Sequence, residues 1–439
     1  MSTKKEIEVI GYLPDDTPPL WKLIFFALQQ MVVMFPATVM VALLTGFHIS
    51  TTIFASGLAT IGFVLITKGR IPLYYGSSFS YIAAIVAITG VKEFGEVAPD
   101  FLISQAQCGI IASGLVSIVA GLIINQFGRD KIEKVLPPSV TGSVAIVIGI
   151  SLAGSAMTGA ASNWTAALIT LLATILFSVY LRGTLGQLPI LFGVLVGYVV
   201  SWGLGIIDFS NITSAAIFKT PHFTFPVWSW SAIIAIMPIA IATIPESTAH
   251  LYQIDLYVNN LAKKLGSKKE YSIAGLLGVN LVGDGIADMI AGAIGGPAGT
   301  NYGENNSVMA ITKNFSVPVI LLAAVFAIIL SFFGKLAGAV NSVPGAVIGG
   351  VSIYLFGVIA VQGVALMLSE KVDLFSAKNL AIASTILIIG IGGSFAFPNG
   401  MIPVFGFHIP AIATAAVFGI LLNLVFLLFP TEQADAVKE

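Results

Sequence analysis

The chain has 439 residues, of which 57% are hydrophobic and only 9% are charged, and its formal net charge is −1. Soluble domains carry about 25% charged residues, so this composition excludes an ordinary water-soluble protein and gives no basic surface for nucleic acid. The single cysteine, Cys108, excludes an internal disulfide. The composition indicates an integral membrane protein in a lipid bilayer.

Residues 1–19 are polar and are expected to form a cytoplasmic N-terminal segment. The first apolar run starts at Trp21, continues for about 25 residues and has no small-residue cleavage site, so it is expected to remain as a span rather than act as a signal peptide.

About 20 apolar residues in a helix cross the hydrocarbon core, and the sequence offers fourteen such runs. The first seven-span set, 20–206, contains runs at 20–45, 49–67, 76–90, 101–124, 138–157, 163–181 and 188–206. The second set, 231–429, contains runs at 231–256, 271–293, 302–314, 315–337, 343–368, 377–396 and 410–429. An aromatic-rich connecting segment, 207–230, suits the membrane interface, and 430–439 is expected to be a cytoplasmic tail.

The positions of Lys and Arg support this map. With the N-terminus inside, 17 of the 20 fall in cytoplasmic segments, and only Lys92, Lys219 and Lys335 do not. Positive residues concentrate in cytoplasmic loops, so we expect a multi-pass protein of the cell (inner, cytoplasmic) membrane with both termini cytoplasmic.

An internal repeat relates the two sets. Val, Gly, Val and Ile recur at the same offsets after Pro137 and after Pro344, seven spans apart. Chance matching of small apolar residues is the alternative. A repeat of seven spans must have inverted topology, and transporters built this way place the substrate site between broken helices at the midplane.

The third and tenth spans are the expected broken helices. Each is short and opens with small or polar residues, at 75–81 and 295–306. We expect short extended segments followed by half-helices, whose first backbone N–H groups have no partner within the helix and point to one centre. Ordinary external loops are the alternative.

Five ionisable residues lie inside predicted spans: Glu246, His250, Asp284, Asp288 and Glu304. Such residues are costly in a bilayer and usually face an interior site. Glu246 and His250 are four residues apart on one helical face, so the pair could pass a proton. A structural role is the alternative, and it is favoured for the two aspartates.

The remaining histidines lie in connecting segments and are expected to be solvated; they are His48, His222 and His408.

The segment from Tyr302 to Lys313, YGENNSVMAITK, resembles the signature of the nucleobase–ascorbate transporter family, which includes bacterial uracil and xanthine permeases. Further matches are LQQ at 28–30, MFPATV at 34–39, IP at 71–72 with GSSF at 76–79, and GDG at 283–285. The resemblance implies an all-α fold of 14 transmembrane spans in two inverted repeats. It also implies a core domain (about 20–124 and 231–337), a gate domain (about 138–206 and 343–429), a homodimer, and proton-coupled uptake of uracil or a xanthine-like purine.

The same resemblance assigns roles to individual residues. It implies substrate binding by Glu246, Glu304, Phe79, Gly303, Tyr302, Ala37, Ser78, Asn305 and Gln30, with backbone amides acting at Phe79 and Gly303. It implies proton coupling by Glu246, His250 and Asp284. No metal and no cofactor other than the proton gradient is expected.

Three residues depart from the family pattern. Gln30 stands where uracil permeases usually have His, Pro36 replaces a Gly, and Ser307 replaces the signature Gly. These departures bear on the substrate more than on the mechanism. Glu304 followed by Met309-Ala310 favours the uracil type over the xanthine type, which usually has Gln at the Glu304 position.

The main alternative is an inorganic or carboxylate anion transporter of the same seven-plus-seven architecture, because half-helix N-termini suit anions. Two glutamates without Lys or Arg at the pocket-forming positions argue against it. A channel is disfavoured because no filter is recognisable. An enzyme is disfavoured because neither a metal-ligand spacing nor a nucleophile constellation occurs.

Overall fold

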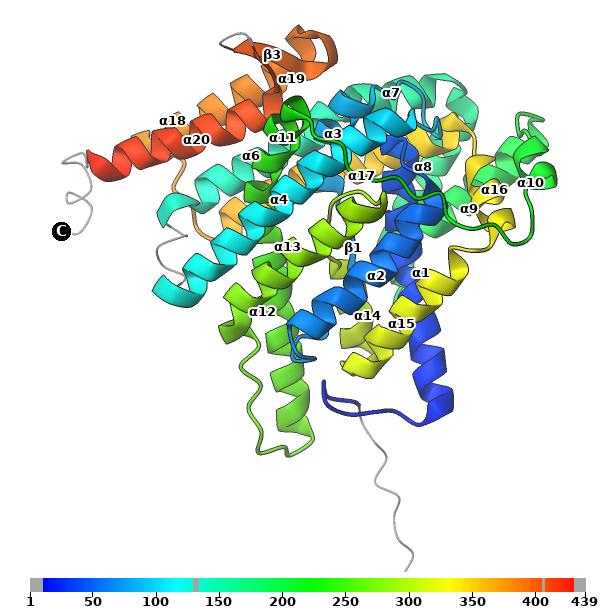
Figure 1. The fold of residues 1–439 in the computed structure, drawn as a ribbon, viewed down its shortest axis with the longest axis horizontal. Helices are drawn as coiled ribbons and strands as arrows, with labels where there is room; N and C mark the ends of the chain where they lie inside the picture. The colour runs from blue at the N-terminus through cyan, green and yellow to red at the C-terminus, as the bar shows by residue number, and fades with distance from the viewer. Residues whose placement is uncertain (1–10, 129–133, 405–406, 430–439) are drawn as a thin grey trace, which may run out of the picture.

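A computed structural model describes residues 11–128, 134–404 and 407–429. Most of the predicted N-terminal segment and all of the predicted tail, 430–439, lie outside the described residues. The described part is mostly helical, as predicted (Figure 1).

Within the described residues, the first half contains nine α-helices, one strand and two 3₁₀ turns. In chain order these are α1 (Leu20–Thr45), α2 (Ile49–Ile66), β1 (Tyr75–Ser77), η1 (Phe79–Tyr81), α3 (Ile82–Thr89), α4 (Asp100–Phe127), α6 (Pro138–Ser151), α7 (Ala153–Ala161), α8 (Trp164–Tyr180), η2 (Leu185–Gln187), α9 (Pro189–Gly203) and α10 (Ser210–Ser214). The second half opens with α11 (Trp230–Ile236).

The second half continues with α12 (Ala240–Lys264), α13 (Leu277–Ile294), β2 (Gly299–Asn301), α14 (Gly303–Thr312), α15 (Val317–Leu330), α16 (Gly334–Asn341), α17 (Gly345–Ser369), α18 (Ala377–Leu387), α19 (Gly393–Ala396), β3 (Met401–Val404), β4 (Phe407–Pro410) and α20 (Ala411–Leu428). Short turns η3 (Met237–Ile239), η4 (Ala274–Leu276) and η6 (Pro398–Gly400) and a π-helical turn, η5 (Ile388–Gly392), adjoin these helices.

Within the described residues, nine helices are long and apolar enough to cross a membrane. Shorter apolar helices lie at Phe79–Thr89, Trp164–Tyr180, Pro189–Gly203 and Val317–Leu330. Many of their outward side chains are exposed apolar residues, such as Leu172 and Leu421, which is the surface that lipid requires. The total of fourteen spans stays a prediction.

The helices pack in two groups. In one, α13 packs against α2 and α4, and α15 packs against α1 and α2; in the other, α17 packs against α6, α7 and α8. Helices α18 and α20 lie together at the opposite side of the molecule from α1 and α15 (Figure 1). The predicted division into core and gate domains is compatible with these groups and stays a prediction.

Glycines allow the closest contact in the first group. A Cβ at Gly114 would lie 2.4 Å from the Gly285 carbonyl oxygen, and one at Gly285 would lie 2.3 Å from that of Gly114. Without side chains at these two positions, the backbones of α4 and α13 can touch, which is a common way to pack helices in membranes.

Two three-residue strands join the halves of the chain. β1 and β2 pair antiparallel, with Tyr75 opposite Asn301 and Ser77 opposite Gly299. The hydroxyls of Ser56 and Thr60 on α2 each donate to the Tyr75 carbonyl at 2.9 Å. The backbone polar groups of these extended segments therefore find hydrogen-bond partners inside the protein, which non-helical backbone within a membrane needs.

Candidate functional site

The strand pair places the starts of two half-helices beside each other. η1 and α3 follow β1, and α14 follows β2, as the sequence predicted for the broken spans. The Ser78 N–H donates to the Ala298 carbonyl at 3.0 Å, and the Tyr302 N–H donates to the Tyr74 carbonyl at 2.9 Å. These bonds fix the turn that precedes each half-helix.

Backbone N–H groups at both starts remain available for a ligand. Phe79 begins η1 and Gly303 begins α14, so neither N–H has a carbonyl one turn earlier in its own helix. Hydrogen-bond donors at a helix N-terminus carry partial positive charge and can bind an electron-rich oxygen.

The first residues of the two half-helices, Phe79 and Gly303, line a cavity of about 550 Å³. One part of its wall comes from β1, η1, α12, β2 and α14, and the other comes from α6, η2 and α17. Polar lining residues include Ser77, Ser78, Ser80, Thr141, Gln187, Glu246, His250, Gln253, Thr300, Asn301, Tyr302, Glu304, Ser307 and Gln362.

Two carboxylates face this cavity from different elements. Glu246 lies in the interior of α12, where the Ser80 hydroxyl donates to its Oε2 at 3.4 Å. Glu304 lies in the first turn of α14, where a negative side chain interacts favourably with the helix dipole. Both side chains are partly buried. The site therefore offers two acceptor groups beside two sets of donors.

His250 lies against the start of α14. A Cβ at Gly303 would come within 2.7 Å of His250 Nε2, so glycine is needed for this close approach. Its Nδ1 is buried and has no hydrogen-bond partner among the described residues. The imidazole, one helical turn from Glu246, thus lines the cavity.

Tyr302 is a fixed part of the wall. Its hydroxyl donates to the Ser77 carbonyl at 3.0 Å and lies 2.9 Å from the Thr38 hydroxyl. A Cβ at Gly76 would lie 2.4 Å from the tyrosine ring. The phenol therefore packs against β1 and holds it next to the start of α14.

Asp284 lies behind the cavity rather than in its wall. It accepts a hydrogen bond from Ser247, and the Asn280 side chain donates to the Ser247 hydroxyl at 2.7 Å. Asn301 joins the same network by donating to Ser247 at 3.0 Å. Asp284 can therefore support α12 and β2 without touching a ligand.

Asp288 supports the strand pair. Its Oδ1 accepts from the Gly299 N–H at 2.7 Å and from the Tyr75 hydroxyl. This placement fits the structural role that the sequence favoured for it.

Three predicted binding residues also lie behind the wall. The Asn305 side chain donates to Gln30 Oε1 at 2.7 Å and to the Gln30 carbonyl at 3.0 Å, which joins α14 to α1. Ala37 is buried in α1. The structure thus brings Ser78, Phe79, Glu246, His250, Tyr302, Gly303 and Glu304 together on the cavity and leaves Gln30, Ala37, Asn305 and Asp284 off its surface. All their assigned roles stay predictions.

Sequence reasoning missed several polar residues of the wall. Ser80 and Gln253 come from η1 and α12, whereas Gln187 and Gln362 come from η2 and α17. Gln362 had a recognisable signal, because it is the sole amide side chain in the apolar α17. Gln187 lies between two predicted spans and belongs to no motif, so the sequence alone gives no reason to select it.

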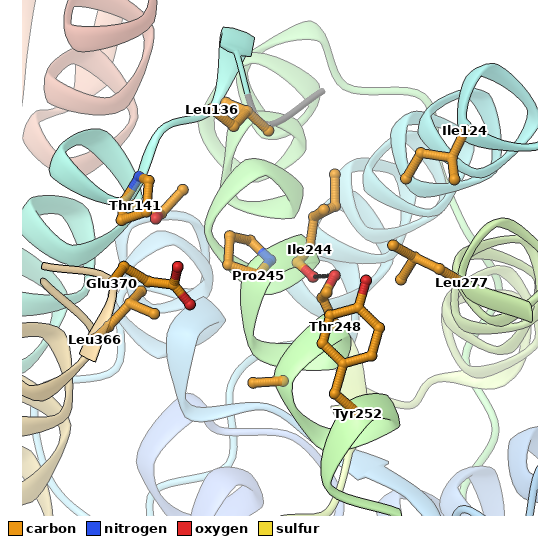
Figure 2. A pocket seen from close by; sticks show the side chains of 12 residues that line it. Ile124, Leu136, Thr141, Ile244, Pro245, Thr248, Tyr252, Leu277, Leu366 and Glu370 are labelled. Carbon is orange, nitrogen blue, oxygen red and sulfur yellow. Dashed lines mark hydrogen bonds between the residues drawn. The ribbon is translucent and has the colours of Figure 1, made fainter. Parts of the chain in front are cut away.

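The structure has a second pocket of about 230 Å³. Figure 2 shows side chains that line it. Thr141 and Leu366 lie on one side of it and Ile124 and Leu277 on the other, with α12 passing between them (Figure 2). Both hollows share Thr141, Pro245, Ala249 and Leu366. They therefore lie along one route between the two helix groups.

A polar cavity that two half-helix starts enter, inside a bundle of apolar helices, defines a multi-pass membrane transporter. The profile of the permease family matches residues 21–399. The chain belongs to this family, the nucleobase–ascorbate transporters, and is a permease rather than an enzyme.

Curated relatives match over nearly the whole chain. Uracil permease of Bacillus caldolyticus is 39% identical over 427 residues, which cover 93% of each chain. Uracil permease of Bacillus subtilis (strain 168) is 35% identical and covers 100% of this chain and 99% of its own.

Solved structures with low sequence identity share the fold. The murine Slc26a9 anion transporter in its inward-facing state gives a TM-score of 0.63 at 12% identity, covering 98% of this chain and 73% of its own. The transmembrane domain of the cyanobacterial bicarbonate transporter BicA gives 0.54 at 14% identity, covering 92% and 97%. These likenesses concern the fold alone.

Proposed function

We propose that this protein imports a nucleobase by proton-coupled transport, with uracil as the preferred substrate and a xanthine-like purine as the second choice. The observation that carries the proposal is the meeting of two carboxylates and two half-helix starts at one cavity. The uracil permeases among the relatives direct the choice of substrate.

The edge of a pyrimidine-dione matches these groups. Its N–H groups can donate hydrogen bonds to the carboxylates of Glu246 and Glu304. Its carbonyl oxygens can accept hydrogen bonds from the backbone N–H groups of Phe79 and Gly303. The Phe79 ring can add apolar contact to a flat heterocycle. Each polar atom of the ring edge thus has a partner in the wall.

The same site offers a place for the coupled proton. Glu246 and His250 both line the cavity and lie one helical turn apart on α12. Glu246 can accept a proton when the substrate binds, and His250 on the same helix face can exchange it. Asp284 acts through Ser247 by holding α12 in position.

Alternating access would use the two groups of helices. In this proposal the core domain (20–124 and 231–337) carries the base and proton sites, and the gate domain (138–206 and 343–429) closes over them. The cavity wall from α6 and α17 lies where such a gate would meet the core. We further propose fourteen spans, two inverted repeats, a homodimer, and cytoplasmic termini in the inner membrane.

Anion transport is the second candidate, because the structural neighbours include an anion transporter and a bicarbonate transporter. The lining chemistry disfavours it: Glu246 and Glu304 would repel an anion, and the described lining residues include neither Lys nor Arg.

Uptake of labelled uracil into proteoliposomes tests the proposal. We expect accumulation above the external concentration when the proton gradient is imposed, and only equilibration when a protonophore collapses it. Accumulation that survives the protonophore would remove proton coupling. A thermal-shift panel of uracil, xanthine, hypoxanthine, sulfate and benzoate identifies the ligand class, since a ligand stabilises the state that binds it; a response to sulfate alone would establish the anion alternative.

A further inference from the structure

We propose that His48, Asp100 and His222 form a binding site for a divalent transition-metal ion, with Zn²⁺ as the ion that fits best. One ligand atom from each residue lies within 4.8 Å of the other two. His48 Nε2 is 3.1 Å from Asp100 Oδ1, and His222 Nε2 is 2.7 Å from Asp100 Oδ2. Each of the two imidazoles therefore points its Nε2 atom at the Asp100 carboxylate.

The donor set indicates the class of metal. Two imidazole nitrogens and one carboxylate oxygen are a known zinc ligand set, in which a water completes the tetrahedron. Ca²⁺ and Mg²⁺ prefer oxygen ligands only, and imidazole nitrogen favours zinc and its neighbours in the first transition row. The two imidazole rings have centroids 4.4 Å apart. Asp100 and His222 are exposed and His48 is partly buried, so modest side-chain movements would bring all three donors around one ion.

The surrounding backbone holds the three residues in place. His48 is the N-cap residue of α2, and Asp100 is the first residue of the long helix α4. The His222 carbonyl accepts from the Thr51 hydroxyl at 2.6 Å. Because every ligand stands on or against a helix start, metal binding requires little ordering of the chain, which favours affinity.

Further bonds fasten the connecting segment beside the cluster. Gln107 donates to the Thr224 carbonyl at 2.9 Å, and the Val227 N–H donates to the Ser104 carbonyl at 2.9 Å. A bound metal would join His222 in this segment to Asp100 of α4 through the ion, in place of the direct contact between the two side chains.

The cluster is separate from the transport cavity, because none of its three residues lines that cavity. It lies at the end of α1 opposite Lys22, since Lys22 is near the start of α1 and His48 follows its end. From the sequence, no metal was expected and both histidines were predicted to be solvated. The cluster could not be recognised from the sequence, because His48 and His222 are 52 and 122 residues from Asp100 in the chain.

Metal titration of the tag-free protein tests the proposal. The detergent-purified full chain is stripped with EDTA, dialysed and titrated with ZnCl₂ by calorimetry, and CoCl₂ is used as a spectroscopic probe. We expect one saturable Zn²⁺ site, a metal-dependent rise in Tm, and the visible absorption bands of four-coordinate Co²⁺. His48→Gln and His222→Gln should each weaken Zn²⁺ binding about tenfold or more, since even partners of metal ligands contribute 10- to 100-fold.

Matched variants separate this site from other imidazoles. His408→Gln removes a histidine from β4 and should leave the affinity unchanged. Asp100→Asn keeps the shape of the third ligand and should weaken binding as the histidine variants do. All variants are compared at equal helix content and gel-filtration profile. Absence of saturable binding to wild type, or wild-type affinity in both histidine variants, would overturn the proposal.

Discussion

Replacing Glu246 by Gln tests the binding role of this carboxylate with little change in shape. The described residues give Glu246 one hydrogen-bond partner, the Ser80 hydroxyl at 3.4 Å, which is a weak contact. The amide oxygen of Gln can accept the same bond. We therefore expect the variant to fold, because Gln keeps the volume of the side chain and its hydrogen bond.

The substitution should instead lower the affinity for the substrate. A hydrogen bond to a charged group contributes about 1.5–3 kcal/mol, and every 1.4 kcal/mol is about tenfold in affinity. Glu246→Gln should thus weaken uracil binding about 10- to 150-fold. It should also abolish accumulation in proteoliposomes, because the amide cannot carry the proton.

Calorimetry on detergent-purified protein measures the first effect, and uptake under an imposed proton gradient measures the second. Ser80→Ala is the matched control: it removes the neighbour of Glu246 but keeps the carboxylate. The Ser80–Glu246 hydrogen bond is long and therefore weak; if it contributes about 1 kcal/mol, Ser80→Ala should bind uracil within about fivefold of wild type. Glu246→Gln protein that binds and accumulates uracil as wild type does would refute the role of this carboxylate.

Four further substitutions test residues in the same wall or directly beside it. Glu304→Gln should weaken uracil binding or shift preference toward purines, measured by competition with xanthine; an unchanged preference contradicts it. Phe79→Tyr should keep measurable binding, whereas Phe79→Pro, which deletes the N–H, should lose it in protein that still assembles; full-strength binding by a folded proline variant excludes the amide contact. Gly76→Ala places a methyl group 2.4 Å from the Tyr302 ring, so overpacking should cost about 1–3 kcal/mol; a Tm equal to that of wild type would show that the ring can move aside.

The broken spans could be predicted because their cause is local. Runs that are too short for the bilayer and open with Gly, Ser and Asn cannot be ordinary transmembrane helices. The structure confirms strands at Tyr75–Ser77 and Gly299–Asn301, each followed by a short helix. The pairing of Tyr75 with Asn301 could not be read from the sequence, since it depends on how distant segments meet.

The sequence could not show which site residues line the cavity and which lie behind its wall. Asp284 and Asn305 stand in recognised motifs, but a motif does not say which side of a helix faces the cavity. The structure places Asp284 against Ser247 and Asn305 against Gln30, one layer behind the wall. Gln187, in contrast, faces the cavity although it lies outside every motif.

The distribution of charge around the cavity bears on the proposed alternating access, in which a gate domain moves against a core domain. The ionisable side chains of the wall, Glu246, His250 and Glu304, all come from α12 and α14, whereas α6, η2 and α17 contribute apolar residues and neutral amides such as Gln362. Burying a charge without a partner is costly, so a gate that carried its own charge would gain or lose a partner each time it moved. A neutral gate can separate from the core without leaving an unpaired charge behind. The proposed base and proton contacts then stay on one body throughout the cycle, and the gate needs only to exchange apolar contacts and neutral hydrogen bonds.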